Sequence, residues 1–422
     1  MLYPIGIQSF SEIRNGGYVY VDKTALIYSL TSTGKYYFLS RPRRFGKSLL
    51  VSTLEAYFRG RKDLFKGLAI EELEKDWVEY PVLRLDLTGS RYTSVNDLRE
   101  NLALHLSGWE RTYGKDDEFT EPAARFKSVI DAAYRKTGRK VVILIDEYDK
   151  PIVDNIDDPA LMDAFRRELQ GFYSVIKGKD EFIRFAFLTG VTKLGKMSIF
   201  SGLNNLNDIS MDLGFSDICG VSEAELKEYF DGSVTELAEA CRMSREECYS
   251  KLKTMYDGYH FNESASGVYN TDSLLKTFKA NEFRMYWFET GTPTFLVRYF
   301  ERSRYNLASI CKEKVPEATL ANVDYETPSL LTQMYQTGCL TISSYDCRFK
   351  TYNLDYPNKE VKYGFVNFLC QFYAQGLING KFSISSFVCD IEKGDVLGFM
   401  DRFTSFLSDN NYEIQGDLEL YF

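Results

Sequence analysis

The pattern of hydrophobic and polar positions changes along the chain. Between residues 36 and 188, short apolar runs alternate with longer amphipathic stretches. The runs are 36–39, 82–87, 141–145 and 182–188, and the amphipathic stretches are 48–58, 95–113, 124–135 and 161–176. This alternation is typical of a parallel sheet covered by helices on both faces. The run 141–145 is apolar at every position, which predicts a central strand.

After residue 221 the strand-like runs become rare and helical periodicity dominates. Predicted helices cover 223–229, 234–241, 245–256, 274–283, 329–336, 361–377 and 395–407. The helix at 329–336 is followed by a stop at Gly338 and by a predicted hairpin of 339–343 and 349–354, a combination that resembles a winged helix. We therefore predict an α/β domain at residues 1–220, a helical domain at 221–325, and a winged-helix-like and helical segment at 326–422.

Composition excludes several classes of protein. The 422 residues are 44% hydrophobic, which rules out a disordered or fibrous chain. Two histidines make a Ser-His-Asp hydrolase or a histidine metal site a poor hypothesis, and eight cysteines without a C-x-x-C pair suggest reduced core thiols. Without a signal-peptide pattern or an apolar run of roughly 18 residues, we expect a cytoplasmic protein.

The charge is negative overall but unevenly distributed. The chain carries 51 Lys and Arg against 60 Asp and Glu, a formal charge of -9. Residues 1–60 nevertheless contain eight basic and three acidic side chains. This balance argues against a nucleic-acid clamp formed by the whole molecule and leaves room for a local basic patch.

The strongest chemical signal is the segment 41–48 (RPRRFGKS), which follows a predicted strand and opens a predicted helix. It resembles the P-loop, or Walker A motif, G-x-x-x-x-G-K-[S/T], whose backbone N–H groups surround phosphates. Arg41 stands where the first glycine is usual, and Pro42 lacks an N–H and biases Arg41 towards an extended conformation. The alternative is that Gly46, Lys47 and Ser48 simply begin an ordinary helix.

In this interpretation the Lys47 ammonium neutralises the β- and γ-phosphates and the Ser48 hydroxyl binds Mg²⁺. The residues predicted to contact the nucleotide are Arg43, Arg44, Phe45, Gly46, Lys47, Ser48 and Leu49. Arg43 and Arg44 could also act as arginine fingers, screen the phosphates, or pair with a neighbouring acid.

A second signal is the segment 140–149 (KVVILIDEYD), a buried strand that ends in carboxylates. In a P-loop sheet this is the place of the Walker B motif. Asp146 would hold Mg²⁺, and Glu147 would act as the general base towards the attacking water. The alternative is an acidic turn after a strand, which is common in α/β proteins.

A third buried strand, within residues 185–193, ends in polar side chains. In a P-loop sheet with an added central strand, such an end faces the γ-phosphate. Thr189 or Thr192 would then hold the attacking water. Either threonine could instead cap the next segment.

Taken together, these motifs closely resemble the bacterial and archaeal AAA-ATPase-like family. The resemblance covers nearly the whole chain and rests on the residues already quoted and on the segments 4–6, 9–10, 20–24, 190–193, 198–206, 256–261 and 286–293. It implies that Arg41 is the family's usual substitution for the glycine. It also implies a C-terminal PD-(D/E)xK nuclease domain, whose acids and lysine are not identifiable here, so we expect that domain to be absent or truncated after residues 410–417.

The sequence thus predicts a protein that binds ATP and Mg²⁺ and hydrolyses the nucleotide. Lys47, Glu147, Thr189 and Thr192 are its candidate catalytic residues, and Ser48 and Asp146 its candidate metal ligands. The alternative is a regulatory module with little or no turnover, which binds DNA or a protein through its C-terminal half. Neither hypothesis involves a membrane, and neither predicts an oligomeric state.

Overall fold

The computed structural model describes residues 1–156, 158–193, 199–200, 205–287, 310, 312–321, 329–374, 390 and 393–408. The chain divides into two compact units, Met1–Lys362 and Tyr363–Phe422. The predicted boundary at 325/326, the motif residues 198, 201–204 and 288–293, and the segment 410–417 lie outside the described residues. The division into domains at 1–220, 221–325 and 326–422 therefore stays a prediction.

A five-stranded parallel sheet forms the centre of the first unit. Its strands are β1 (Tyr36–Ser40), β2 (Val82–Asp86), β3 (Val141–Asp146), β4 (Ile183–Gly190) and β5 (Asn207–Asp208), in the order β2-β3-β4-β1-β5. The chain leaves β1 for the edge strand β2 and returns through β3 and β4. The carboxyl ends of β3, β4 and β1 therefore meet at one edge, where ligands bind in open parallel sheets.

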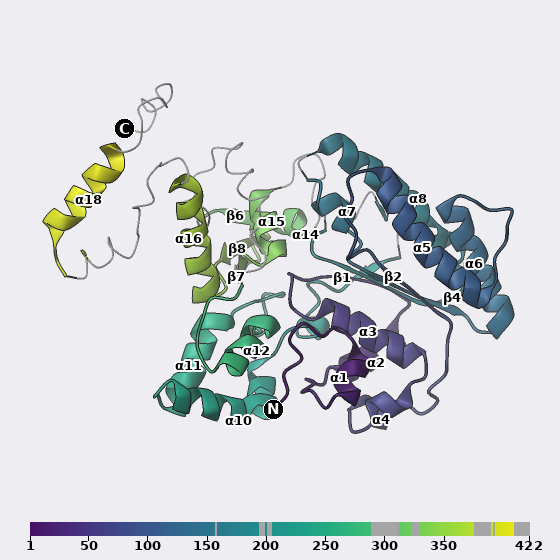
Figure 1. The fold of residues 1–422 in the computed structure, drawn as a ribbon, viewed down its shortest axis with the longest axis horizontal. Helices are drawn as coiled ribbons and strands as arrows, with labels where there is room; N and C mark the ends of the chain where they lie inside the picture. The colour runs from purple at the N-terminus through teal and green to yellow at the C-terminus, as the bar shows by residue number, and fades with distance from the viewer. Residues whose placement is uncertain are drawn as a thin grey trace. The chain divides into compact units, whose positions relative to one another are not determined.

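Helices cover both faces of this sheet, as predicted (Figure 1). On one face lie α5 (Val95–Tyr113), α6 (Pro122–Thr137) and α8 (Pro159–Gly178); on the other lie α1 (Phe10–Asn15), α2 (Thr24–Thr33), α3 (Lys47–Phe58) and α4 (Ile70–Leu73). A one-turn helix, α7 (Lys150–Val153), follows β3. Every residue of β3 is buried, which explains the unbroken apolar run 141–145.

Three helices follow the sheet: α10 (Glu223–Ala240), α11 (Arg245–Tyr256) and α12 (Thr271–Ala280). The prediction of two helices at 223–229 and 234–241 was wrong. Phe230 and Val234, on either side of the expected break, are both buried in one core, and this packing keeps α10 continuous through Gly232. The helix predicted at 274–283 begins earlier and ends earlier, because Asn270 caps its start and Asn281 adopts a left-handed conformation.

The remainder of the first unit contains a small antiparallel sheet. Strands β6 (Lys314–Pro316), β7 (Thr341–Asp346) and β8 (Thr351–Asp355) pair in the order β6-β8-β7, with helices α14 (Glu317–Ala321) and α15 (Leu330–Thr337) between β6 and β7. A helix followed by a hairpin agrees with the sequence, whereas β6 was not predicted. The assignment as a winged helix stays a prediction.

Helix α16 (Lys359–Ala374) begins in the first unit, and α18 (Val396–Ser408) belongs to the second. Both lie close to the predicted helices at 361–377 and 395–407. The Asp395 carboxylate accepts a hydrogen bond from the Gly398 N–H at 2.9 Å and so caps the start of α18.

The five cysteines whose side chains the structure describes are all free thiols. Cys219, Cys248 and Cys339 are buried, as expected of core thiols, and Cys241 is partly buried. Cys347 departs from the prediction because the turn between β7 and β8 exposes it.

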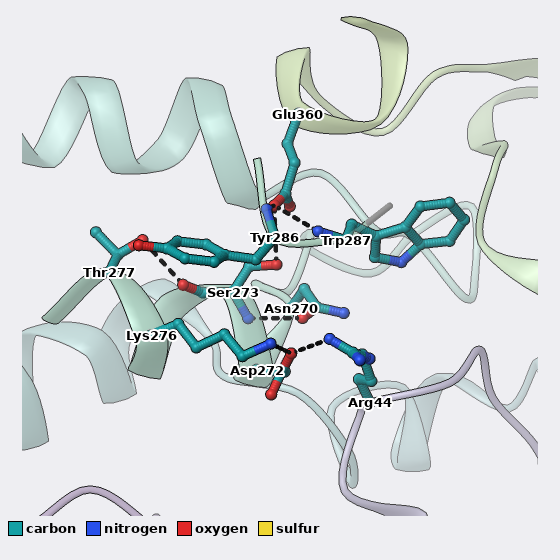
Figure 2. Close-up of polar contacts among 9 residues, drawn as sticks. All are labelled: Arg44, Asn270, Asp272, Ser273, Lys276, Thr277, Tyr286, Trp287 and Glu360. Carbon is teal, nitrogen blue, oxygen red and sulfur yellow. Dashed lines mark hydrogen bonds and ion pairs between the residues drawn. The ribbon is translucent and has the colours of Figure 1, made fainter. Parts of the chain in front are cut away.

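A buried carboxylate joins three parts of the first unit (Figure 2). Glu360, in the first turn of α16, accepts hydrogen bonds on one oxygen from the Ser273 hydroxyl at 3.1 Å and from the N–H groups of Tyr286 at 2.6 Å and Trp287 at 3.0 Å. Its other oxygen, Oε2, has no hydrogen-bond partner in the described part of the chain. Burial raises the pKa of Glu360 to about 7 in spite of these donors.

We expect the free energy of unfolding to fall as the pH rises from 5 to 8, and Glu360→Gln to remove part of that fall. Folded Glu360 keeps its proton up to about pH 7, whereas the unfolded side chain loses it near its ordinary pKa of 4.5. The native state therefore binds more protons in this window, and stability is lost as the pH rises, by up to about 3 kcal/mol from this group.

Urea unfolding of wild type and Glu360→Gln at pH 5 and pH 8 measures this contribution. Glu228→Gln, at an exposed position of α10, is the matched control and should follow wild type. Identical pH dependence in wild type and Glu360→Gln would contradict the assignment.

Candidate functional site

The predicted site residues meet at the carboxyl edge of the sheet. The β1–α3 loop (residues 41–46) follows β1, a run of carboxylates follows β3, and polar residues follow β4. Two backbone hydrogen bonds connect these segments: the Arg41 N–H donates to the Gly190 carbonyl at 3.2 Å, and the Tyr148 N–H donates to the Thr189 carbonyl at 3.0 Å. The sheet topology thus brings together groups that are up to 150 residues apart in sequence.

The β1–α3 loop turns at Arg44 and Gly46. Their φ angles are 71° and 91°, in the left-handed region that favours glycine. Gly46 is the N-cap of α3 and supplies no side-chain cap, so the first N–H groups of this 12-residue helix have no capping side chain. Uncapped N–H groups at a helix start favour an anion.

Arg41, in the position of the usual glycine, is a buried anchor. Its guanidinium donates to the carbonyls of Ser40 at 3.0 Å, Ser210 at 2.7 Å and Phe215 at 3.1 Å, and it lies 3.9 Å from the ring centre of Phe261. A buried cation is tolerated only when it is well solvated by such dipoles. Arg41 therefore fixes the loop to the segment after β5 and to the aromatic run 256–261.

The neighbouring loop residues make further contacts with the rest of the first unit. The buried ring of Phe45 packs edge-on against Tyr259 and Phe261, with ring centres 4.7 and 5.6 Å apart. The aromatic run 256–261 thus packs against the loop. Gly338, which ends α15, lies so close to Pro42 that a Cβ atom there would be 2.9 Å from the Pro42 Cβ. The side chain of Phe45 is therefore committed to packing, and its carbonyl accepts a hydrogen bond from the Gly220 N–H at 3.1 Å, which leaves the Phe45 N–H for a ligand.

Lys47 is buried and bends back over its own loop. Its ammonium donates to the carbonyls of Arg41 at 3.1 Å and Pro42 at 3.2 Å, and it lies 3.1 Å from the Glu147 carboxylate. Glu147 adopts a φ of 52°, which costs a non-glycine residue conformational energy. The ion pair holds this carboxylate against the β1–α3 loop.

Asp146 is completely buried, and neither carboxylate oxygen forms a hydrogen bond within the described residues. Burial and the nearby charge of Glu147 raise the pKa of Asp146 to about 6, while the Ser48 hydroxyl and the Lys47 ammonium act in the opposite direction. A buried carboxylate without a partner is costly, so the site favours a cation beside it.

Asp149 is as buried as Asp146, but its carboxylate accepts several hydrogen bonds. Its carboxylate accepts hydrogen bonds from the Thr192 N–H at 2.7 Å, the Thr192 hydroxyl at 2.8 Å and the Val191 N–H at 3.3 Å. Burial, followed by the charge of Glu147, raises its pKa to about 6. Gly190 allows this close approach, because a Cβ atom there would lie 2.4 Å from an Asp149 oxygen. Asp149 thus ties the end of β4 to the segment after β3.

The two candidate threonines differ in whether their hydroxyl groups are hydrogen-bonded. The Thr192 hydroxyl donates to Asp149 and is therefore already engaged. The Thr189 hydroxyl is fully buried and has no hydrogen-bond partner in the described ranges. Of the two, Thr189 has the hydroxyl that is available to a ligand.

Arg43 and Arg44 also differ. Arg43 is exposed, whereas the Arg44 guanidinium forms an ion pair with Asp272 on α12 (Figure 2). The Lys276 ammonium contacts the same carboxylate at 2.9 Å. Among the roles that the sequence left open for Arg44, the structure shows pairing with an acid.

Helix α15 reaches the same edge. The Gln336 side-chain oxygen accepts a hydrogen bond from the Lys193 N–H at 2.9 Å. The Lys193 ammonium is buried and lies 2.9 Å from the Asp208 carboxylate of β5. The segment after β4 is therefore held by α15 and by the neighbouring strand.

Sequence reasoning missed the anchors of the site. Asp149 stood in the quoted motif without a role, and its signal was a third acid directly after a buried strand. Arg41 was noted only as a substitution, although an arginine beside Pro42 after a buried strand could have indicated a structural cation. Asp272 and Gln336 carried no signal, because their partners lie 228 and 143 residues away.

Two features are not found in the described part of the chain. No three His, Cys, Asp or Glu side chains in it are grouped so that they could hold a metal without other ligands. None of its helices has the length and apolar content needed to cross a bilayer.

Restoring a glycine at Arg41 should destabilise the protein. Arg41→Gly removes the guanidinium that donates to the carbonyls of Ser40, Ser210 and Phe215, so we expect a loss of at least about 2 kcal/mol in the free energy of unfolding. Urea unfolding measures it, with Arg43→Gly at the exposed neighbouring position as the matched control. An Arg41→Gly protein as stable as the control would show that the contacts are incidental.

Comparison with known proteins places this geometry in a family. The family model described as Predicted AAA-ATPase matches residues 4–200, which include β1 to β4 and the edge groups up to Lys193. An uncharacterized protein in the vnfD 5′ region of Azotobacter chroococcum mcd 1 is 41% identical over 363 residues, which are 85% of this chain and 68% of the relative. On these similarities, the chain belongs to the AAA-ATPase-like family.

Proposed function

We propose that this protein binds Mg-ATP at the carboxyl edge of the sheet and hydrolyses it. The observation that carries the proposal is Asp146, a fully buried carboxylate with no hydrogen-bond partner in the described residues, next to an uncapped helix start. A divalent cation would satisfy its oxygens, and a triphosphate would satisfy the free N–H groups. The family description supports nucleotide binding in general terms.

The β1–α3 loop and the first turn of α3 would hold the phosphates. Backbone N–H groups between Arg43 and Leu49 are the proposed donors, and the Lys47 ammonium would exchange its two carbonyl partners for phosphate oxygens. Ser48 and Asp146 would hold Mg²⁺, which supplies positive charge opposite the phosphates. One hydroxyl and one carboxylate suffice because Mg²⁺ in such sites keeps waters and phosphate oxygens as its other ligands.

Glu147 is the proposed general base. Its carboxylate pairs with Lys47, so a triphosphate that engages Lys47 would release Glu147 to accept a proton from water. The water oxygen then forms a bond to the γ-phosphorus, the bond to the β-phosphate oxygen breaks, and ADP leaves with those electrons. The Thr189 hydroxyl is the proposed group that orients this water.

A second candidate function is nucleotide-dependent regulation of DNA or a protein partner, with little or no turnover. It is favoured by the contacts of α15 with the edge, through Gln336 to Lys193 and through Gly338 to Pro42. These contacts would let the state of the β1–α3 loop affect the C-terminal half. The two functions differ in whether the protein hydrolyses ATP with Glu147 as the general base.

Nucleotide binding should require Lys47 and Mg²⁺. At 100 times the dissociation constant, Mg-ATP should stabilise wild type by about 2.7 kcal/mol. Lys47→Met, which keeps the buried stem and removes the charge, should lose most of this effect, and so should wild type in EDTA. Thermal unfolding with and without ligand measures it; an unchanged melting temperature for wild type with excess Mg-ATP would contradict ATP binding.

Glu147→Gln should separate binding from hydrolysis. Glutamine keeps the shape of the side chain and removes the base, so we expect normal Mg-ATP binding and a hydrolysis rate lower by about 10² or more. ADP production by purified wild type and variant measures this, with calorimetric binding as the control. Equal rates in the two proteins would favour the regulatory function.

A further inference from the structure

A cleft of about 390 Å³ lies on the face of the sheet that α1 and α3 cover, partly open to solvent (Figure 1). By the same measure of volume one water needs about 10–15 Å³, so the cleft has room for an organic molecule. Its walls come from the segment 8–11, the C-terminal half of α3, the turn after α3, and β2, all in the first unit. None of the described lining residues is a proposed contact of ATP or Mg²⁺.

Hydrogen bonds between the walls fix the shape of this cleft. The Phe10 N–H donates to the Ser52 hydroxyl of α3 at 2.9 Å. The Arg14 guanidinium, in the last turn of α1, donates to the carbonyls of Leu64 at 2.8 Å and Lys66 at 2.7 Å. Helix α1 is therefore tied both to α3 and to the turn that follows α3, so the walls are held in place by the fold itself.

The charge of the lining is positive, although the whole chain carries -9. Three of the described lining residues are arginines, Arg59, Arg61 and Arg84, and one is an acid, Glu55; three positive charges minus one negative charge leave +2. Asp63 pairs with Arg61 from outside this lining and reduces the local sum to +1. Since a cleft with walls of low dielectric constant concentrates the potential of its charges, the lining favours an anion.

Glu55 positions two of these arginines but cannot neutralise both. One of its carboxylate oxygens lies 3.0 Å from the Arg59 guanidinium, and the other lies 3.1 Å from the Arg84 guanidinium. Arg84 uses only Nη1 for this contact, whereas a guanidinium carries five N–H donors. Further N–H groups are thus left for another acceptor, and their fork geometry matches the oxygens of a phosphate. The hydroxyls of Ser9 and Ser11, 3.0 Å apart, also line the cleft.

The cleft is separate from the carboxyl edge but lies on the same elements. Ser52 is four residues after Ser48, which places it one turn, or about 6 Å, farther along α3. Arg84 precedes Asp86 by two residues in β2, and Asp86 is the register partner of Asp146. An anion in the cleft would therefore lie beside the C-terminal half of α3, away from the helix start that would hold the triphosphate.

We propose that this cleft binds a small phosphorylated molecule, at a site distinct from the proposed nucleotide site. Guanidinium groups that a carboxylate holds in place suit a phosphate, and the volume leaves room for the organic part of the ligand. A recess of this size favours a small molecule over a double helix, and the net charge of -9 opposes an extended polyanion. The proposal does not depend on ATP hydrolysis.

Calorimetric titration of inorganic pyrophosphate in EDTA into Lys47→Met protein tests the site, because this variant lacks the ammonium of the proposed nucleotide site. We expect one pyrophosphate to bind per chain. Adding Arg59→Gln or Arg84→Gln should weaken binding about fivefold or more, whereas adding Glu55→Gln should strengthen it, since the carboxylate competes for the same guanidinium groups. Arg139→Gln, at an exposed position, is the matched control and should leave the affinity unchanged.

Each outcome decides for or against the site. Absence of pyrophosphate binding to folded Lys47→Met protein, or equal affinities after Arg59→Gln and Arg139→Gln, would overturn it. Arg59 is exposed, so its variant should fold and settle the question even if Arg84→Gln does not fold. Citrate binding as tight as that of pyrophosphate would overturn the preference for phosphate. Tighter binding of a labelled DNA duplex, lost in Arg59→Gln, would overturn the assignment to a small molecule. In the otherwise wild-type protein, Arg59→Gln should keep the full stabilisation by Mg-ATP, so the two sites are tested independently.

Discussion

The carboxyl edge of the sheet depends on the burial of one cation, the Arg41 guanidinium. Removal of a guanidinium from water is costly unless polar groups replace the lost hydration. Here the carbonyls of Ser40, Ser210 and Phe215 and the ring of Phe261 replace it. These partners come from three separate segments, so the same contacts that solvate the charge also fix the β1–α3 loop. Tertiary contacts therefore impose the loop conformation. A glycine at position 41 would instead allow this conformation through its own backbone flexibility.

Three acidic residues, Asp146, Glu147 and Asp149, lie close together at the same edge. Asp149 accepts hydrogen bonds from N–H and hydroxyl donors, and Glu147 forms an ion pair with Lys47, but the Asp146 oxygens form no hydrogen bond within the described residues. The rise in its pKa from 3.8 to about 6 corresponds to about 3 kcal/mol of unfavourable burial and repulsion. Since folding tolerates this cost at a place where an uncapped helix begins, the arrangement suits a bound cation together with an anion. Local charge, rather than the overall value of -9, determines what this edge can bind.

Sequence reasoning succeeded where the signal is local. Apolar runs predicted β1 to β4, and spacing singled out Lys47, Ser48, Asp146 and Glu147, which the fold brings to one edge and whose roles stay predictions. It failed where the partner is distant or where packing overrides propensity. The solvation of Arg41 depends on residues about 170 positions away, and Glu360 joins groups up to 87 positions away. Periodicity predicted two helices, at 223–229 and 234–241, yet the buried positions on either side of Gly232 keep α10 continuous. Periodicity describes one element at a time, whereas these features arise between elements.

The side chains of the β1–α3 loop explain why it is not rich in glycine. Arg41 and Phe45 contact the aromatic run 256–261, Pro42 contacts Gly338, and Arg44 contacts α12. A glycine-rich loop could adopt the turn but could make none of these contacts. A ligand that changes the partners of Arg44 or Lys47 must therefore change the interaction free energy between the loop and the helical region. Thermodynamic linkage makes that effect reciprocal, so a partner bound to the helical region would alter affinity at the loop by the same factor. The contacts that replace glycine thus make the site dependent on the rest of the first unit.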